Sequence, residues 1–350
     1  MSEEVFRHST ITTQSSELRY PEVFLNEFGR NFADATPPHR LSVADVAMRS
    51  VFVSGQNGED NNMTTLLLFG NPGTGKTTSY SVLSKLIKGS NPRRVTLNSE
   101  STRSDIIGFP YINPQSGDIE YVPNALVEGD VVLIDEIDKA PAEILANLSD
   151  AFSEKKAKIL NREMNLGHNI LTVVAANSID NLPGYIMDRA IASLYVPSHT
   201  TKSRADAYKM RGNTINPIFD ADTVKALGKL ISQMARFSSV VDYASQRIED
   251  VAGEFSYNEA GSSIIKSARS INAVMDISKT NAWIRTAADK RNQPFEVNKK
   301  DVDLAVRISL FHKAFWAHNN SEQSLFSDKS YAETNEHISK IFDKILGYVK

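Results

Sequence analysis

The stretch GNPGTGKTT, residues 70–78, decides the fold because it has the composition and spacing of a phosphate-binding loop. Gly70, Gly75, Lys76 and Thr77 satisfy the pattern GxxxxGK[ST]. Glycines allow backbone N–H groups to surround a phosphate, and the N-terminus of a following helix adds free donors and a positive dipole. We expect Lys76 to contact the β- and γ-phosphates of a nucleotide and the Thr77 hydroxyl to bind Mg²⁺. The expected phosphate-binding residues are Gly70, Asn71, Pro72, Gly73, Thr74, Gly75, Lys76, Thr77 and Thr78.

The loop lies between a strand-like run and a helical pattern, and this alternation continues to about residue 200. The helical pattern after the loop starts at Lys76 and stops near Gly89, and another follows Pro141 with its apolar residues on one stripe. The strand-like runs mostly lack polar alternation, as is typical of strands buried on both faces. The sequence therefore predicts an α/β fold with a doubly wound parallel sheet of the P-loop NTPase type. The predicted strands are residues 63–69, 93–97, 131–134, 170–176 and 191–196.

Beyond about residue 200 the pattern becomes almost entirely helical. Asn298 is the expected N-cap of one helix, with Asp301 near its third position. We expect an N-terminal arm over residues 1–40, an α/β nucleotide-binding domain over 41–198 and an all-helical lid domain over 199–350. The last segment is predicted to be an amphipathic helix, with Ile338, Ile341, Phe342, Ile345, Leu346 and Val349 on its apolar face.

Two further predicted strands end in polar residues, at the sheet edge where ligands of such sheets bind. The run VVLIDEIDK, residues 131–139, delivers Asp135 and Glu136 to that edge, and ILTVVAAN delivers Asn177. We expect Asp135 to hold the water shell of Mg²⁺ and Glu136 to orient and deprotonate an attacking water. The Asn177 amide would contact both the γ-phosphate and that water.

The composition excludes several classes of protein. The chain has 350 residues and no cysteine, which excludes disulfides, Cys-ligated metals and a thiol nucleophile. The net charge of −3 provides no overall attraction to nucleic acid or to an anionic membrane. No apolar run reaches the length of a signal peptide core or a membrane span. We therefore expect a cytoplasmic protein with no membrane partner.

Two classes of nucleotide enzyme fit the motifs less well. A GTPase is suggested by the NKxD match at residues 298–301, but no buried strand precedes it and Asp135 is not followed by the expected glycine. A DExD-type helicase is suggested by residues 135–138. That class needs a second α/β domain, whereas the second half of this chain is predicted to be helical.

A third class fits better, because the chain resembles the AAA+ ATPases and, within them, the MoxR-type group. The resemblance runs from about residue 42 to residue 317. The matching stretches are GNPGTGKTT, residues 95–126, residues 131–152, VVAANSIDNLPGYIMDRA at 173–190, and SARSINAVMDISKTNAW at 267–283 with VNKKDV at 297–302. The resemblance implies two β-hairpin inserts, one over residues 110–123 that turns near Ser116-Gly117 and one within residues 156–170.

The resemblance also implies roles for three residues and the ligands ATP and Mg²⁺. Asn177 corresponds to the family's sensor 1. SARSIN resembles the start of the sensor-2 helix, which makes Arg269 the γ-phosphate sensor of the lid, although a plain surface arginine remains an alternative. LPGYIMDRA makes Arg189 an arginine finger that acts on the nucleotide of the next subunit. The alternative for Arg189 is an ion pair with Asp188.

The function that this resemblance implies is a ring-forming ATPase, expected to be a hexamer, which remodels or assembles a client protein. A client or adaptor protein, often with a von Willebrand A domain, would be its partner. One alternative is a nucleic-acid motor or the ATPase subunit of a restriction or replication complex, for which EKKAKILNR supplies Lys155, Lys156, Lys158 and Arg162. Another is a scaffold that binds ATP and hydrolyses it slowly, which the presence of Glu136 disfavours.

Overall fold

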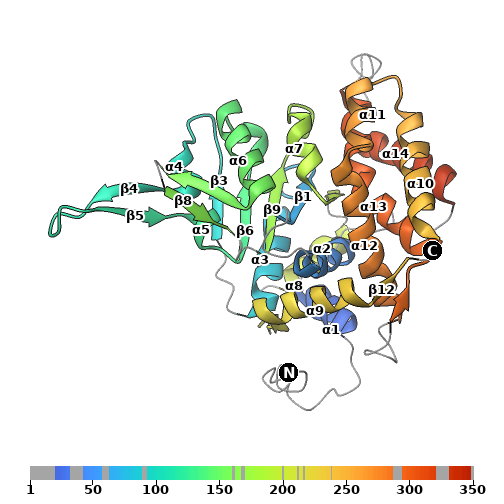
Figure 1. Ribbon diagram of the computed structural model, residues 1–350, viewed down its shortest axis with the longest axis horizontal. Helices are drawn as coiled ribbons and strands as arrows, with labels where there is room; N and C mark the ends of the chain where they lie inside the picture. Colours follow the sequence, from blue (N-terminus) through green and yellow to red (C-terminus); the bar gives the residue numbers. More distant parts are fainter. Residues whose placement is uncertain are drawn as a thin grey trace, which may run out of the picture.

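A five-stranded parallel sheet forms the centre of the fold (Figure 1). The computed structural model describes residues 20–31, 42–56, 63–88, 93–159, 162–166, 170–198, 201–210, 213–215, 217–237, 239–286, 294–320 and 331–347. The strand order is β10-β1-β9-β6-β3, and every neighbouring pair is parallel. All five predicted strands are confirmed. They are β1 (Thr65–Phe69), β3 (Arg93–Thr96), β6 (Val131–Asp135), β9 (Leu171–Ala176) and β10 (Ala192–Tyr195).

The central strands β1, β6 and β9 are buried at every position, which explains their continuous apolar sequence. Flanking helices supply the other side of the core. The amphipathic helix predicted after Pro141 is α6, whose apolar stripe from Ile144 to Phe152 is buried. The helices and the 3₁₀ turn of this half are α1 (Tyr20–Asn31), α2 (Val43–Gln56), α3 (Lys76–Leu86), α4 (Arg103–Ile107), α5 (Ala125–Glu128), η1 (Ile137–Lys139), α6 (Ala142–Glu154) and α7 (Gly184–Arg189).

Both predicted β-hairpins are present. The first consists of the antiparallel strands β4 (Gly108–Ile112) and β5 (Ile119–Pro123), lies between α4 and α5, and projects from the sheet (Figure 1). Gly108 closes its base with a φ of +115°, and a Cβ there would lie 2.1 Å from the carbonyl oxygen of Val122. The second hairpin pairs β7 (Lys156–Ile159) with β8 (Arg162–Asn165).

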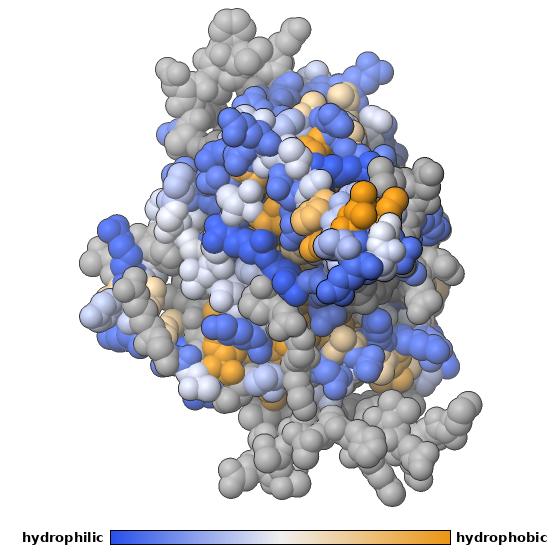
Figure 2. Space-filling model, turned by 90° about the vertical axis from the view of Figure 1, so that its left-hand side faces the viewer, coloured by the Kyte–Doolittle hydropathy of each residue, from blue (hydrophilic) through white to orange (hydrophobic). Residues whose placement is uncertain are grey.

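The first hairpin exposes apolar side chains to solvent. Viewed from this end, the molecule shows a compact hydrophobic patch among hydrophilic residues (Figure 2). The cross-strand partners Ile112 and Ile119 are 69% and 59% exposed. Such exposure is unusual for a side chain that has no binding role. The exposed large apolar residues of the hairpin are Phe109, Tyr111, Ile112, Ile119 and Val122.

The second half of the chain is helical, as predicted, apart from three two-residue strands within its described residues. Asn298 caps α13, and the Asp301 carboxylate completes a capping box by accepting from the backbone N–H of Asn298. On α14 the described apolar residues face the core, whereas Val349 lies outside the described residues. The elements are α8 (Thr201–Lys209), β11 (Phe219–Asp220), α9 (Ala221–Met234), β12 (Ala235–Arg236), α10 (Val240–Glu254), α11 (Glu259–Ile265), α12 (Ala268–Thr286), β13 (Phe295–Glu296), α13 (Lys299–Asn319) and α14 (Tyr331–Leu346), with β2 (Ile87–Lys88) paired to β11.

The predicted domain boundaries at residues 40 and 198 stay predictions. The two halves pack together extensively, with α2 of the first half against α9 and α12 of the second. None of the described helices is both long enough and apolar enough to cross a bilayer.

The packing of α2 on α9 depends on two glycines that allow the helix backbones to touch. A Cβ added at Gly228 would lie 2.0 Å from the carbonyl carbon of Gly55. We therefore expect Gly228→Ala to lower the free energy of unfolding by about 1–3 kcal/mol or more, because neither helix backbone can move aside without disturbing its own packing. Denaturant titration measures this. Gly253→Ala on α10 is the matched control, since a Cβ there meets nothing within 4 Å. An equal effect of the two substitutions would contradict the packing argument.

Candidate nucleotide-binding site

The predicted phosphate loop lies at the carboxyl edge of the sheet, between β1 and α3. Gly70, Gly73 and Gly75 have φ values of +141°, +78° and +96°, which residues with a side chain rarely adopt. The loop can therefore turn its backbone N–H groups inward, directly before the N-terminus of α3. The motif GxxxxGK[ST] thus has glycine at positions 70 and 75 because the loop backbone adopts positive φ there.

Lys76 is held across the mouth of this loop. Its side chain is buried, and its Nζ donates to the carbonyl oxygens of Gly70 (2.6 Å) and Asn71 (3.0 Å) and to Oδ1 of Asn177 (3.1 Å). Burial lowers the pKa of Lys76, while the nearby carboxylates of residues 135, 136 and 138 oppose that shift. The Asn177 contact joins β9 to the loop, as the sequence predicted for neighbouring strand ends.

Thr77 and Asp135 form the candidate metal site. Thr77 Oγ1 donates to Oδ2 of Asp135 over 3.1 Å, and Asp135 is buried at the end of β6. A hydroxyl and a carboxylate are the hard oxygen ligands that Mg²⁺ prefers, and Mg²⁺ commonly takes one or two protein carboxylates with phosphate oxygens and water. These residues therefore fit the ion. Arg94 was not predicted from the sequence. Its Nη2 donates to the same Asp135 oxygen over 2.8 Å, and the available signal was the basic pair at the start of β3.

Glu136 follows Asp135 in a left-handed backbone conformation, with φ at +57°. Such values are uncommon for residues other than glycine and cluster at functional sites. Its carboxylate is half-buried and lies 3.0 Å from the ammonium of Lys139. The turn after β6 is also tied to β9, because Oδ1 of Asp138 accepts from the backbone N–H of Asn177 over 3.2 Å. This turn brings a second carboxylate beside the candidate metal site.

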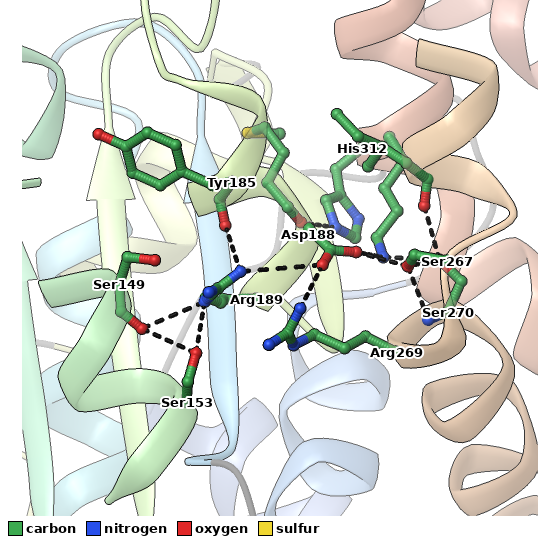
Figure 3. A network of polar contacts seen from close by, with 12 residues as sticks. Ser149, Ser153, Tyr185, Asp188, Arg189, Ser267, Arg269, Ser270 and His312 are labelled. Atoms are coloured by element: carbon green, nitrogen blue, oxygen red, sulfur yellow. Dashed lines mark hydrogen bonds and ion pairs between the residues drawn. The ribbon is translucent and has the colours of Figure 1, made fainter. Parts of the chain in front are cut away.

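Arg189 lies elsewhere, at the C-terminus of α7 (Figure 3). Its Nε donates to the carbonyl oxygen of Ser149 (3.1 Å) and to Oγ of Ser153 (2.7 Å), both on α6. Its Nη1 lies 3.8 Å from Asp188. An ion pair with Asp188 was the alternative interpretation of Arg189. This contact is longer than the two hydrogen bonds that Arg189 donates to α6.

Arg269, near the start of α12, points toward the same place. Its Nη1 donates to Oδ2 of Asp188 over 2.9 Å (Figure 3). The Arg269 side chain is 38% exposed. Arg189 and Arg269 both line a cavity of about 380 Å³ together with Met63 and Lys279.

The two arginines are separated from the phosphate loop by the length of a strand. Met63, which directly precedes β1, shares their cavity, and the backbone N–H of Ile191 bonds the carbonyl of Thr65 at the start of β1. The phosphate loop follows the other end of β1, about 16 Å away for five residues at the usual rise. The structure therefore brings together the loop with Thr77, Asp135, Glu136 and Asn177 at one sheet edge, and places Arg189 with Arg269 near the opposite edge.

Comparisons with known proteins agree with this geometry. Residues 65–193 match the family model of an AAA domain of the dynein-related subfamily. A Lon protease from Metamycoplasma arthritidis (strain 158L3-1) is 29% identical over 140 residues, which are 37% of this chain and only 17% of the protease.

A solved structure, of a presumed ATPase from Cytophaga hutchinsonii, superposes with a TM-score of 0.65 over 91% of this chain and 93% of that one. At 16% identity this likeness shows the fold alone. Residues 65–193 are thus similar to an AAA domain, and the fold of the chain, a parallel α/β core followed by a helical lid, is like that of the AAA+ ATPases.

Proposed function

We propose that this protein is a Mg²⁺-dependent ATPase that works as a closed ring, in which each phosphate site is completed by arginines of the neighbouring chain. The separation of Arg189 and Arg269 from the phosphate loop of their own chain is the observation that carries the proposal. Both residue groups have the chemistry of one ATPase site, but the intervening strand keeps them apart. A second copy that presents its arginine edge to the first copy's phosphate edge would unite them.

In this assignment the phosphate edge of each chain binds ATP with Mg²⁺ and activates the attacking water. Lys76 and the loop amides hold the β- and γ-phosphates of ATP, and Thr77 with Asp135 holds Mg²⁺, which would neutralise phosphate charge when bound. Glu136 takes a proton from the attacking water, and Asn177 orients that water against the γ-phosphate. The arginines of the neighbour neutralise the charge that builds on the phosphoryl oxygens in the transition state.

The apolar hairpin favours a protein as the partner on which this ATPase acts. Residues 108–123 expose five large apolar side chains and contain no Lys or Arg. Aromatic and aliphatic side chains are typical of protein-binding surfaces, whereas nucleic-acid surfaces are rich in positive charge. The hairpin thus supports a protein partner, and we propose a MoxR-like chaperone role in a hexameric ring, in which hydrolysis remodels or assembles a client or an adaptor with a von Willebrand A domain.

The alternative of a nucleic-acid motor is less well supported. Of the basic residues that suggested it, Lys155 is 5% exposed and Lys156 pairs with Glu163 over 2.7 Å. ATPase rates with and without DNA or RNA, at two salt concentrations, discriminate the two functions. Stimulation by nucleic acid that fades at high salt would favour the motor.

Two measurements test the proposed ATPase. Phosphate release with Mg²⁺ and after chelation of divalent ions tests the chemistry, and sedimentation with and without ATP tests the assembly. We expect hydrolysis only with the metal and a ring in the presence of ATP. A protein that stays monomeric with ATP and hydrolyses it at full rate would contradict the proposal.

The role of Thr77 can be tested separately with Thr77→Val, which keeps the shape of the side chain and removes the hydroxyl that contacts Asp135. We expect the Mg²⁺ concentration for half-maximal turnover to rise roughly tenfold or more, because the metal loses one ligand. Thr286→Val is the matched control, since its hydroxyl donates to the carbonyl oxygen of Ala282 within α12 and is not part of the phosphate loop. Equal metal dependence in the two variants would assign the metal elsewhere.

A further inference from the structure

A buried ion pair joins the segment that carries Arg189 to the helical lid. Lys313 of α13 is 1% exposed, and its Nζ donates to Oδ1 of Asp188 (3.2 Å) and to Oγ of Ser270 (2.7 Å). A lysine at such depth loses its hydration, and it remains charged only beside an acid. Asp188 precedes Arg189 directly, so this pair lies at the base of the proposed arginine finger.

Asp188 has two cationic partners within hydrogen-bonding distance, which bind separate oxygens, while Arg189 lies farther away at 3.8 Å. Lys313 and Ser267 donate to Oδ1, whereas Arg269 donates to Oδ2 (Figure 3). The exposure of the partners differs greatly, because the Arg269 side chain is 38% exposed and Lys313 is almost fully buried. Departure of Arg269 would therefore leave the Oδ1 contacts of Asp188 intact.

The charges support this difference. Burial opposes ionisation of Asp188, but Lys313, Ser267 and Arg269 together lower the pKa of Asp188 below its usual value. Burial lowers the pKa of Lys313 to about 8, against the stabilising charge of Asp188. Near neutral pH the pair is therefore charged and balanced, which leaves the positive charge of Arg269 available for another anion.

Contacts around the Asp188–Lys313 pair hold α7 against α13. We therefore expect the Arg269 side chain, and not α7, to move. His312 contacts the carbonyl oxygen of Met187 over 3.1 Å, and Trp316 Nε1 donates to that of Leu182 over 2.9 Å. Burial lowers the pKa of His312 to about 3, so this histidine is neutral at working pH and adds no competing charge.

We propose that Lys313 is the permanent counter-ion of Asp188, and that it allows Arg269 to leave Asp188 for the γ-phosphate bound by the neighbouring chain. Lys313 is then a positioning residue, which acts through Asp188 and never touches nucleotide. The inference rests on the proposed function. Without Lys313, Arg269 would be the only described cation that is hydrogen-bonded to Asp188, and moving it would leave this buried carboxylate with only the 3.8 Å contact of Arg189.

Lys313→Met tests the proposal. We expect kcat to fall about ten- to hundredfold with little change in KM, because Arg269 is retained on Asp188. The double variant Asp188→Asn with Lys313→Met should regain most of the lost turnover, since a neutral amide holds an arginine weakly. Arg307→Met is the matched control, because Arg307 is another buried cation of α13, whose partner is Asp343. It should lower the unfolding temperature without changing kcat more than about twofold.

Mixed oligomers separate this inference from the proposed function. A Lys313→Met chain keeps Lys76 and Glu136, and a Glu136→Gln chain keeps the arginines, so a mixture should hydrolyse ATP faster than either variant alone. Recovery with Arg189→Ala but not with Lys313→Met would overturn the role of Lys313 and leave the ring proposal standing. Failure of both mixtures would overturn the shared site. A double variant as slow as Lys313→Met would show that Lys313 does not act through Asp188.

Discussion

Arg189→Ala is expected to lower ATP turnover by about 10³-fold, at the low end of what arginine fingers contribute in NTPases, and to leave ATP affinity nearly unchanged. We expect turnover but not affinity to change, because Arg189 contacts α6 in its own chain and lies a strand's length from its own phosphate loop. The loss would arise in the transition state, where the guanidinium neutralises phosphoryl charge. Single-turnover kinetics with fluorescence-monitored nucleotide binding separates the two effects.

Mixed oligomers provide the control for Arg189. Adding Glu136→Gln chains should restore part of the activity, since each Arg189→Ala phosphate site can then face an intact arginine. Arg189→Lys keeps the charge but loses the planar fork, so its rate should fall between wild type and alanine. An alanine variant with near wild-type turnover would refute the finger.

Glu136→Gln is expected to lower turnover by about 10²–10⁴-fold and to trap ATP on the protein, because the amide cannot accept the proton of the attacking water. The left-handed backbone at residue 136 and the adjacent metal site should be preserved, since glutamine differs little in shape. Retention of labelled ATP after rapid gel filtration, beside the rate of phosphate release, measures both effects.

Lys139→Met serves as the matched control for Glu136→Gln. It removes the ammonium 3.0 Å from the Glu136 carboxylate and leaves the carboxylate itself, so turnover should change only a few-fold. If Glu136→Gln hydrolysed ATP as fast as Lys139→Met, another group would be the base.

The sheet could be predicted because its signals are local, whereas both hairpins were implied by the family resemblance. Strands such as β6 and β9 are continuous apolar runs, and Gly117, with its positive φ, lies in the turn of the first hairpin. The phosphate loop, Asp135 and Asn177 were placed together correctly, because the ends of parallel strands share one edge of the sheet.

The arrangement of the lid could not be predicted, because it depends on contacts between distant residues. Arg269 and Asp188 lie 81 positions apart, and their contact depends on how α12 docks on α7. Lys313 stands in the apolar run FHKAFW and gave no signal, since a lysine in a helix is usually solvent-exposed. The resemblance implied that Arg269 is the γ-phosphate sensor of the lid, and this role stays a prediction. The structure places Arg269 beside Arg189.

The length of β1 makes the proposed activity depend on assembly. Since one chain carries the two halves of the proposed site at opposite ends of a strand, the proposed function predicts that an isolated chain cleaves ATP slowly. Specific activity should fall on dilution, and a cell could switch the enzyme on through its abundance alone, with no dedicated activator.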